Sequence, residues 1–359
     1  MNRLSSKHYV FFLLVVSLVS LRGYSSIFLK IGGRDTWLAA LIAGLIFILY
    51  AFFIFYVSKK TSTYDIRDVF NETYPKIVSN FLLLLFSVGL FLDSIESAAA
   101  QCDSIHSNIF IETPIWYCLL FFIIPGMYLI TKRIDTLVVV IIFTVLVAIG
   151  SDIITEIFTA QYQHPLNCLP ILPNGFTNDF IMCIAMSLGS FCSIAIVFPF
   201  LRYVNKNEHL VRNTTLTTLV IVVIVVFSFF MLVATFGRIR SGNISYPEFV
   251  AAQRIQIKGF IEFGDLLFFM RTIPIWLVKY VLCAVSILYL FKDKFTNKRI
   301  FAVIYSIAAY ICAYLVGKNH FLLFEFLKYY QFVVLALLGI VPFLTYLIFF
   351  IKWKKKIKA

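Results

Sequence analysis

Charged residues inside long apolar runs are the features of this sequence that could do chemistry. Arg22 follows eleven nearly unbroken apolar residues, 10–20. Three further charges, Asp93, Glu96 and Arg271, also lie in apolar runs. A charge at membrane depth is costly and usually faces a partner, a cavity or a pathway. The helical rise puts all four in the same half of a membrane, so we expect one buried, charge-balanced cluster that binds a polar ligand.

A structural role for these charges is the alternative. They could pair only to hold neighbouring helices together, or reach to the membrane interface. For Lys279, in the same run as Arg271, we expect either an interfacial position or an inward pair.

The residues after Arg22 favour a locally unwound helix. Gly23, Tyr24, Ser25 and Ser26 follow the arginine, and glycine and serine often accompany breaks in membrane helices. Free N–H groups at a break suit a carboxylate, and free carbonyls suit an ammonium group or a cation. The expected ligand is therefore a small zwitterion.

The run 178–201 carries small polar residues in its middle: Ser187, Gly189, Ser190, Cys192 and Ser193. Five expected helices precede this run, and it opens a second set of five. An odd number of helices in each repeat inverts the second copy, so two broken helices would meet near the membrane midplane. The alternative is that glycine and serine only permit close helix packing, the interpretation that we prefer for Ala40 and Gly44.

The composition of the chain is that of a polytopic membrane protein. Of its 359 residues, 61% are hydrophobic and 18% aromatic, and the mean hydropathy is +0.92, whereas roughly half of the residues of a soluble domain are apolar. Runs that can cross about 30 Å of hydrocarbon predict an all-α protein of ten helices. The expected helices are 9–29, 36–57, 77–98, 114–130, 137–158, 178–201, 214–236, 266–291, 300–317 and 330–351. They form one domain, 1–359, with a first repeat at about 9–158, a second at about 178–351 and a lysine-rich tail, 352–359.

The net charge of +13 predicts membrane topology rather than nucleic-acid binding. With the N-terminus inside, the cytoplasmic segments hold 20 Lys and Arg residues and the outer segments hold 8. Both termini should therefore be cytoplasmic, with the tail solvated and lying on anionic lipid headgroups. A secretory signal at the start is the alternative, but it lacks an A-x-A-like cleavage site. Its removal would also leave nine spans, and the charge count would then not favour the resulting sides of the lysine-rich tail and the loops together.

Soluble-enzyme and metal chemistry have little support. The chain has no GxxxxGK[ST] or HExxH motif, and its five histidines lie near span ends or in loops. Its seven cysteines form no CxxC pair, so we expect small apolar packers rather than disulfides or metal ligands. We expect no cofactor and no enzymatic activity.

Five short motifs extend over nearly the whole chain: GRDTWLAALIAG (33–44), ETPIW (112–116), NCLPILPNG (167–175), YPEF (246–249) and GFIEFGDLLFF (259–269). In these the chain resembles the endospore germination permeases, the B subunits of nutrient germinant receptors in the amino acid/polyamine/organocation superfamily. The resemblance implies a leucine-transporter-like fold of ten helices with helices 1 and 6 broken. It also implies a small nutrient, often an amino acid, sensed in a pocket of helices 1, 3, 6 and 8. The implied setting is the spore inner membrane, with membrane lipids and the receptor's A and C subunits as partners.

Three positions depart from the pattern of this family. Tyr246 stands where the family usually has tryptophan, and Phe263 where an arginine usually follows the matching glutamate. Ser190 follows Gly189, where relatives often carry a glutamate. A changed pocket polarity would suit a different germinant. Arg22 in the break of helix 1 would be the change that compensates for the altered polarity.

The loop 238–258 is expected to cover the pocket from outside, because it joins two helices and contains a proline turn and a short amphipathic run, PEFVAAQRIQI. A plain solvated linker is the alternative.

Two functions from different classes remain open. In the first, the chain is a sensing subunit in which the nutrient shifts the population of outward and occluded states and the change passes to partner subunits. In the second, it is a working amino acid symporter. Helix 5, 137–158, has no lysine to face the break in helix 1, and its Asp152 and Glu156 are expected at the interface. The missing lysine argues against proton coupling, and mainly because of the family resemblance we favour the sensor.

Overall fold

The computed structural model describes residues 4–173, 175–204, 209–257, 261–291 and 297–358. Some residues used in the charge count and the motifs lie outside these ranges, namely Arg3, Asn174, Lys206, Lys258, Gly259, Phe260, Lys292 and Lys294.

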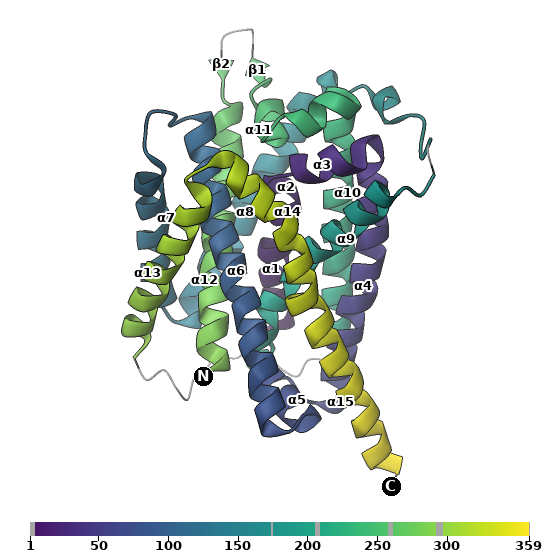
Figure 1. The fold of residues 1–359 in the computed structure, drawn as a ribbon, viewed down its shortest axis with the longest axis vertical. Helices are drawn as coiled ribbons and strands as arrows, with labels where there is room; N and C mark the ends of the chain where they lie inside the picture. Colours follow the sequence, from purple (N-terminus) through teal and green to yellow (C-terminus); the bar gives the residue numbers. More distant parts are fainter. Residues whose placement is uncertain (1–3, 174, 205–208, 258–260, 292–296, 359) are drawn as a thin grey trace.

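The chain forms a bundle of helices with one small hairpin (Figure 1). Its first half contains α1 (Ser6–Ser17), α2 (Ser20–Gly23), α3 (Ser26–Gly32), η1 (Gly33–Asp35), α4 (Thr36–Thr61), α5 (Ile66–Thr73), α6 (Lys76–Asn108), α7 (Ile115–Ile130), α8 (Ile134–Thr159), η2 (Ala160–Tyr162) and η3 (Pro165–Cys168). Its second half contains α9 (Asn178–Cys192), η4 (Ser193–Tyr203), α10 (Leu210–Asn243), α11 (Pro247–Ala252), β1 (Gln256–Ile257), β2 (Ile261–Glu262), α12 (Gly264–Leu290), α13 (Lys298–Gly317), α14 (His320–Val334), η5 (Leu335–Ile340) and α15 (Val341–Lys358).

The ten predicted helices are present. Within the described ranges, nine helical segments are long and apolar enough to cross a membrane, and α7 is a shorter apolar helix. Predicted helix 1 corresponds to α1–α3, helix 3 to α6, helix 5 to α8, helix 6 to α9 with η4, helix 8 to α12 and helix 10 to α14–α15. Leu49, Phe121 and Phe143 are 67–69% exposed on the outside of the bundle, as lipid-facing side chains would be.

Two helices are longer than predicted. α6 continues past residue 98 to Asn108, because its last turns carry polar residues that the bundle buries, Gln101 and Asp103 among them. Hydropathy cannot find such an extension. The final helix begins at His320, passes through a π-helical stretch, and continues to Lys358. The described part of the tail, 352–358, is therefore helical, and its lysines 354–356 are exposed, as expected for a solvated tail.

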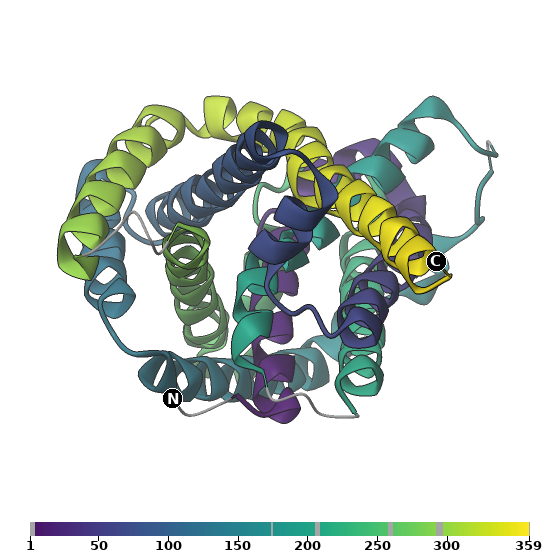
Figure 2. The same ribbon diagram turned by 90° about the horizontal axis from the view of Figure 1, so that it is seen from below.

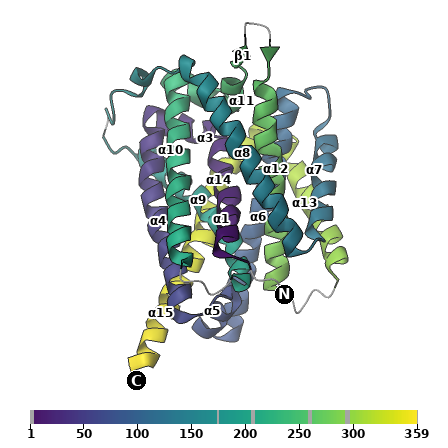
Figure 3. The same cartoon turned by 180° about the vertical axis from the view of Figure 1, so that it is seen from behind.

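Viewed along its axis, the bundle has two opposite edges, with parts of helices 1 and 6 between them (Figure 2). α7 and α13 lie along one edge and α4 and α10 along the opposite edge, with α1 and η4 near the middle (Figure 2). The start of α1 and the end of α15 lie on one side of the bundle, which we call the termini side (Figure 3). α3, α11 and the β1–β2 hairpin lie at the other end, the hairpin side (Figure 1).

Close packing of α4 on α10 explains the small residues of α4. A Cβ atom on Gly44 would collide with the side chain of Val222, and Ala40 is fully buried. The packing interpretation of Gly44 is therefore confirmed.

Candidate functional site

The first helix is broken where the sequence predicts. α2 ends at Gly23 and α3 begins at Ser26, and Tyr24 between them has non-helical angles, φ −133° and ψ 47°. A Cβ atom on Gly23 would lie 2.6 Å from Trp276 Cζ2. Glycine at this position therefore lets Trp276 of α12 pack directly against the break.

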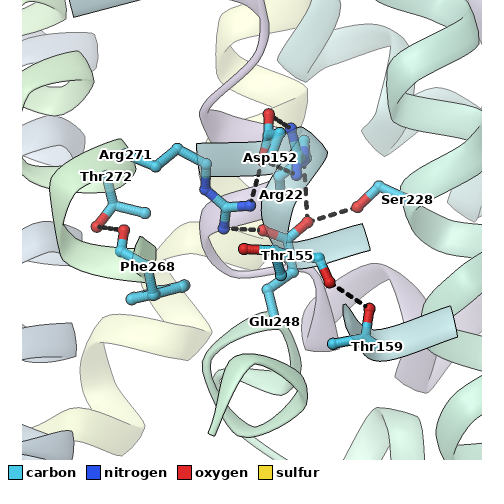
Figure 4. Close-up of polar contacts among 9 residues, drawn as sticks. All are labelled: Arg22, Asp152, Thr155, Thr159, Ser228, Glu248, Phe268, Arg271 and Thr272. Atoms are coloured by element: carbon cyan, nitrogen blue, oxygen red, sulfur yellow. Dashed lines mark hydrogen bonds and ion pairs between the residues drawn. The ribbon is translucent and has the colours of Figure 1, made fainter. Parts of the chain in front are cut away.

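Four charged side chains meet beside this break, and we call them the arginine cluster: Arg22, Asp152, Glu248 and Arg271 (Figure 4). Arg22 Nη1 and Nη2 donate to Asp152 Oδ2 and Oδ1 at 2.8 and 2.9 Å. Arg22 Nε donates to Glu248 Oε1 at 3.0 Å. Arg271 donates to Asp152 Oδ1 at 2.6 Å and to Glu248 Oε2. These side chains come from helix 1, α8, α11 and α12, so the cluster joins four separate elements.

The arginine cluster is charge-balanced and largely dry. Its side chains are 7–19% exposed, and Ser228 donates a further hydrogen bond to Glu248. Two small voids adjoin it, with about 20 and 30 Å³ of free space, which is room for one or two water molecules. A nutrient-sized molecule does not fit, so this conformation is closed around the arginines.

A second buried group, which we call the lysine cluster, contains Asp93, Glu96, Lys279 and Tyr330. Lys279 Nζ lies 3.1 Å from Asp93 Oδ1, pairs with Glu96 Oε2, and donates to Ser20 Oγ at 2.6 Å. The side chains of all three charged members are 0% exposed. The cluster therefore ties helix 1 to α6, α12 and α14 in the interior of the bundle.

Tyr24 belongs to the surroundings of the lysine cluster. Its hydroxyl donates to Glu96 Oε1 and accepts a hydrogen bond from Gln331 Nε2 at 2.9 Å. Its ring stacks at 6.2 Å on Trp276. Tyr24, within the break, thus contacts helices 3, 8 and 10.

The expected cluster of Arg22, Asp93, Glu96 and Arg271 is wrong in its pairing. Arg271 and Lys279 are eight residues apart on α12, about 12 Å along the axis, so each cation meets its own pair of carboxylates. The depth that we estimate for each residue along its helix is too coarse to separate the level of Arg271 from the level of Lys279.

The carboxylates that pair with the two arginines are not the ones that we predict from the sequence. Asp152 was expected at the interface and is instead the carboxylate between both arginines. Glu248 belongs to the YPEF motif and to the amphipathic run of the expected lid, and its place in a loop concealed its pairing with the arginines. Two acidic residues one turn apart in an apolar helix, Asp152 and Glu156, were the signal that could have indicated a buried partner on helix 5. Lys279 pairs inward, which confirms one of its two expected roles.

Helix 6 is not unwound at its small polar residues. α9 continues to Cys192, and from Ser193 to Tyr203 the chain tightens into a 3₁₀-helix. A 3₁₀-helix keeps backbone groups paired in a dry interior, which an open break would not. The expected break is therefore a change of winding at Ser193, whose hydroxyl donates to Asp93 Oδ1 at 3.0 Å.

The other predicted residues of helix 6 are buried packing positions. A Cβ atom on Gly189 would collide with the backbone carbonyl of Gln331, and Ser187 and Ser190 are 0–2% exposed. Cys192 lies against Gly339 of η5, and Ser25 of helix 1 is 1% exposed. All seven cysteines are free thiols, and among the described residues no group of three His, Cys, Asp or Glu side chains could hold a metal ion.

A larger cavity of about 450 Å³ opens on the hairpin side, between helix 1, the segment before α11, and α14. Its lining includes Ser26, Lys30, Ser245, His320 and Lys328. Ser26 Oγ donates to the Ser245 carbonyl at 2.7 Å, and Ser245 Oγ lies 2.9 Å from His320 Nε2. This cavity therefore has hydrogen-bonded contacts with the segment that leads into α11.

Buried Asp103 orients the polar wall of this cavity. Its Oδ2 atom lies 2.8 Å from His320 Nδ1 and accepts a hydrogen bond from Tyr246. Burial and the neighbouring Asp103 carboxylate raise the pKa of Tyr246 well above its usual value of 10.0. The tyrosine is therefore protonated at neutral pH and acts as the donor.

A broken first helix with buried charges beside it, within ten apolar helices, defines a membrane protein of the leucine-transporter type. Two solved structures of mutants of the manganese transporter of Eremococcus coleocola share this fold. One superposes with a TM-score of 0.63 at 12% identity, and the other with 0.62 at 13%, each covering 94% of this chain and 78% of the transporter. At these identities the likeness shows the fold alone. The chain belongs to the spore germination protein family, the spore permeases, whose family model matches residues 4–321. No curated protein matches the chain.

Proposed function

We propose that this protein is the germinant-sensing membrane subunit of a spore nutrient receptor. In this proposal it binds a small nutrient, an amino acid, in the pocket expected between helices 1, 3, 6 and 8, with the nutrient carboxylate at the arginines of helices 1 and 8 beside helix 5. The bound state triggers germination through the receptor's A and C subunits. The arginine cluster is the observation that carries the proposal. It brings two arginines to the break in helix 1, and an arginine fork matches a carboxylate in both charge and geometry.

The carboxylates of Asp152 and Glu248 occupy the positions that a ligand carboxylate would take. Glu248 is the movable member, because it lies on the six-residue helix α11 in the segment between α10 and α12. Withdrawal of α11 would uncover both arginines, and a ligand carboxylate would then replace Glu248. The described part of the expected lid 238–258, which is 238–257, would thus act as that lid.

The direction of approach follows from the charge distribution. With both termini cytoplasmic, the hairpin side and its 450 Å³ cavity face the outside of the spore inner membrane. Lys30 and Lys328 at this cavity would attract an anionic group, and Ser245 would pass a change in the cavity to α11. Binding would shift the population from the closed to the open arrangement.

Germination of spores that carry Arg22→Ala or Glu248→Gln would test this function against a panel of amino acids and other small nutrients. Receptor abundance in the spore membrane is scored in parallel, and Arg133→Ala, an 86% exposed arginine, is the control. We expect loss of the response to one nutrient for Arg22→Ala at normal abundance. Unchanged responses in both variants would contradict the proposal.

Amino acid symport is the second candidate, which the transporter fold favours. Uptake of labelled amino acids by the purified protein in proteoliposomes distinguishes the two. Uptake that depends on an ion gradient would support the symporter, and binding without uptake would support the sensor.

A further inference from the structure

We propose that the lysine cluster binds one exchangeable proton, shared between Asp93 and Glu96, in the conformation seen here. This inference concerns the interior of the bundle and does not depend on the nutrient or on the sensing role.

The charge count of the cluster is the first reason. Asp93, Glu96 and Lys279 have side chains with 0% exposure, so two carboxylates share one paired cation away from water. Arg22 and Arg271 pair with Asp152 and Glu248 and are engaged elsewhere. An uncompensated carboxylate charge in a dry interior is expensive, and uptake of a proton removes that cost.

The proton count at Tyr330 is the second reason. Its hydroxyl oxygen lies within hydrogen-bond distance of Asp93 Oδ1 and, at 3.1 Å, of Glu96 Oε2. The hydroxyl has one hydrogen and can donate to only one of the two. Both contacts become hydrogen bonds if one carboxyl group is protonated and donates to the tyrosine oxygen while the tyrosine donates to the other.

The environment of Asp93 is the third reason. Its Oδ1 atom is contacted by Ser193, Tyr330 and Lys279, whereas its buried Oδ2 atom has no hydrogen-bond partner among the described residues. An ionised carboxylate carries charge on both oxygens, so an unpaired Oδ2 is costly. A neutral carboxyl group leaves that oxygen unpaired at a smaller cost.

Among the described residues, the other titratable groups around the pair supply no second charge of either sign at neutral pH. They are phenols and thiols: Tyr24 of helix 1, Cys192 of α9, Cys283 of α12, Tyr305 of α13 and Tyr330 of α14.

The proton is linked to the packing of the bundle. Side chains of helix 1, α6, η4, α12 and α14 enclose the cluster, and separation of these helices would admit water and stabilise both carboxylates as ions. The closed conformation therefore binds more protons than an opened one, so falling pH favours the closed conformation.

Infrared spectroscopy of the full-length protein in lipid, without nutrient, tests the proposal. At neutral pH we expect a carbonyl band of one protonated carboxylic acid per chain that shifts on exchange into D₂O. Asp93→Asn or Glu96→Gln should remove it, and Glu325→Gln, an exposed carboxyl on α14, should leave it in place. No such band in the unaltered protein, or a band that survives both cluster variants, would overturn the proposal.

The pH dependence of thermal stability is the second measurement. The unaltered protein should lose stability as the pH rises and the shared proton becomes costly to retain. Asp93→Asn has nearly the same shape as the protonated acid, so it should fold and show a flatter profile. The same slope in both proteins would refute the proton site, whatever the outcome of the germination experiments.

Discussion

Arg22 and Glu248 are 226 positions apart in the chain, yet Arg22 Nε donates to Glu248 Oε1 at 3.0 Å. This hydrogen bond ties the break of helix 1 to the short helix α11 on the hairpin side. Together with Asp152 and Arg271 it closes a ring of four charges. The predictions below test what holds this ring and its surroundings together.

The two clusters should behave as separate units. Arg22 and Asp152 share two hydrogen bonds, so a double-mutant cycle with Arg22→Ala and Asp152→Ala should give a coupling energy of about 1–3 kcal/mol. The same cycle with Asp93→Ala in place of Asp152→Ala should give less than about 0.5 kcal/mol, because Asp93 belongs to the lysine cluster. Thermal unfolding of the purified protein supplies the energies. Strong coupling of Arg22 to Asp93 would instead support the single four-charge cluster that we predict from the sequence.

Glu248→Gln should loosen α11. The substitution removes one of two negative charges that hold Arg22 and Arg271, so the lid should open more often. A cysteine placed at Ala251, which lines the void beside the cluster, should then react with a water-soluble maleimide at least about tenfold faster, a change of about 1.4 kcal/mol in the opening equilibrium. Glu72→Gln, an exposed carboxyl on α5, with the same reporter is the control, and equal rates in both would show that Glu248 does not hold α11.

Gly23→Ala should destabilise the protein by about 1–3 kcal/mol through overpacking. The added Cβ atom would lie 2.6 Å from the Trp276 ring, so the tryptophan or the helix break must move. Gly150→Ala on α8 is a matched control, since among the described residues no atom beyond its chain neighbours and its own helix backbone lies within 4 Å of its added Cβ atom. Melting temperatures of the two variants decide the matter, and equal values would mean that the break accommodates a side chain.

Tyr246→Phe should cost about 1–3 kcal/mol, because it leaves the buried Asp103 carboxylate with one donor fewer. The sign of the pH effect follows from the raised pKa of Tyr246. Above about pH 10 the unfolded tyrosine loses its proton while the folded one keeps it, so the unaltered protein loses stability there. The phenylalanine variant should lack this component of alkaline destabilisation. Tyr117→Phe, 45% exposed, is the control, and identical alkaline profiles for Tyr246→Phe and the unaltered protein would contradict the assignment.

Local properties of the sequence were enough for much of the fold. The ten helices follow from apolar runs of sufficient length, and the break at Gly23 follows from a glycine and two serines beside a charge. The extension of α6 to Asn108 was missed, because its last turns are polar residues buried by protein rather than apolar residues facing lipid.

The sequence by itself determined the class of the protein, the number of helices, the break in the first helix, and the burial of Arg22, Asp93, Glu96 and Arg271. All of these depend on residues close together in the chain. Only the tertiary structure decided the partners of those charges. Pairing depends on how each helix is rotated and on which helix lies beside it. The depth of a residue in the membrane gives no information about either. Arg22 therefore meets Asp152 and Glu248, while Asp93 and Glu96 meet Lys279, because the folded bundle separates the two levels of α12.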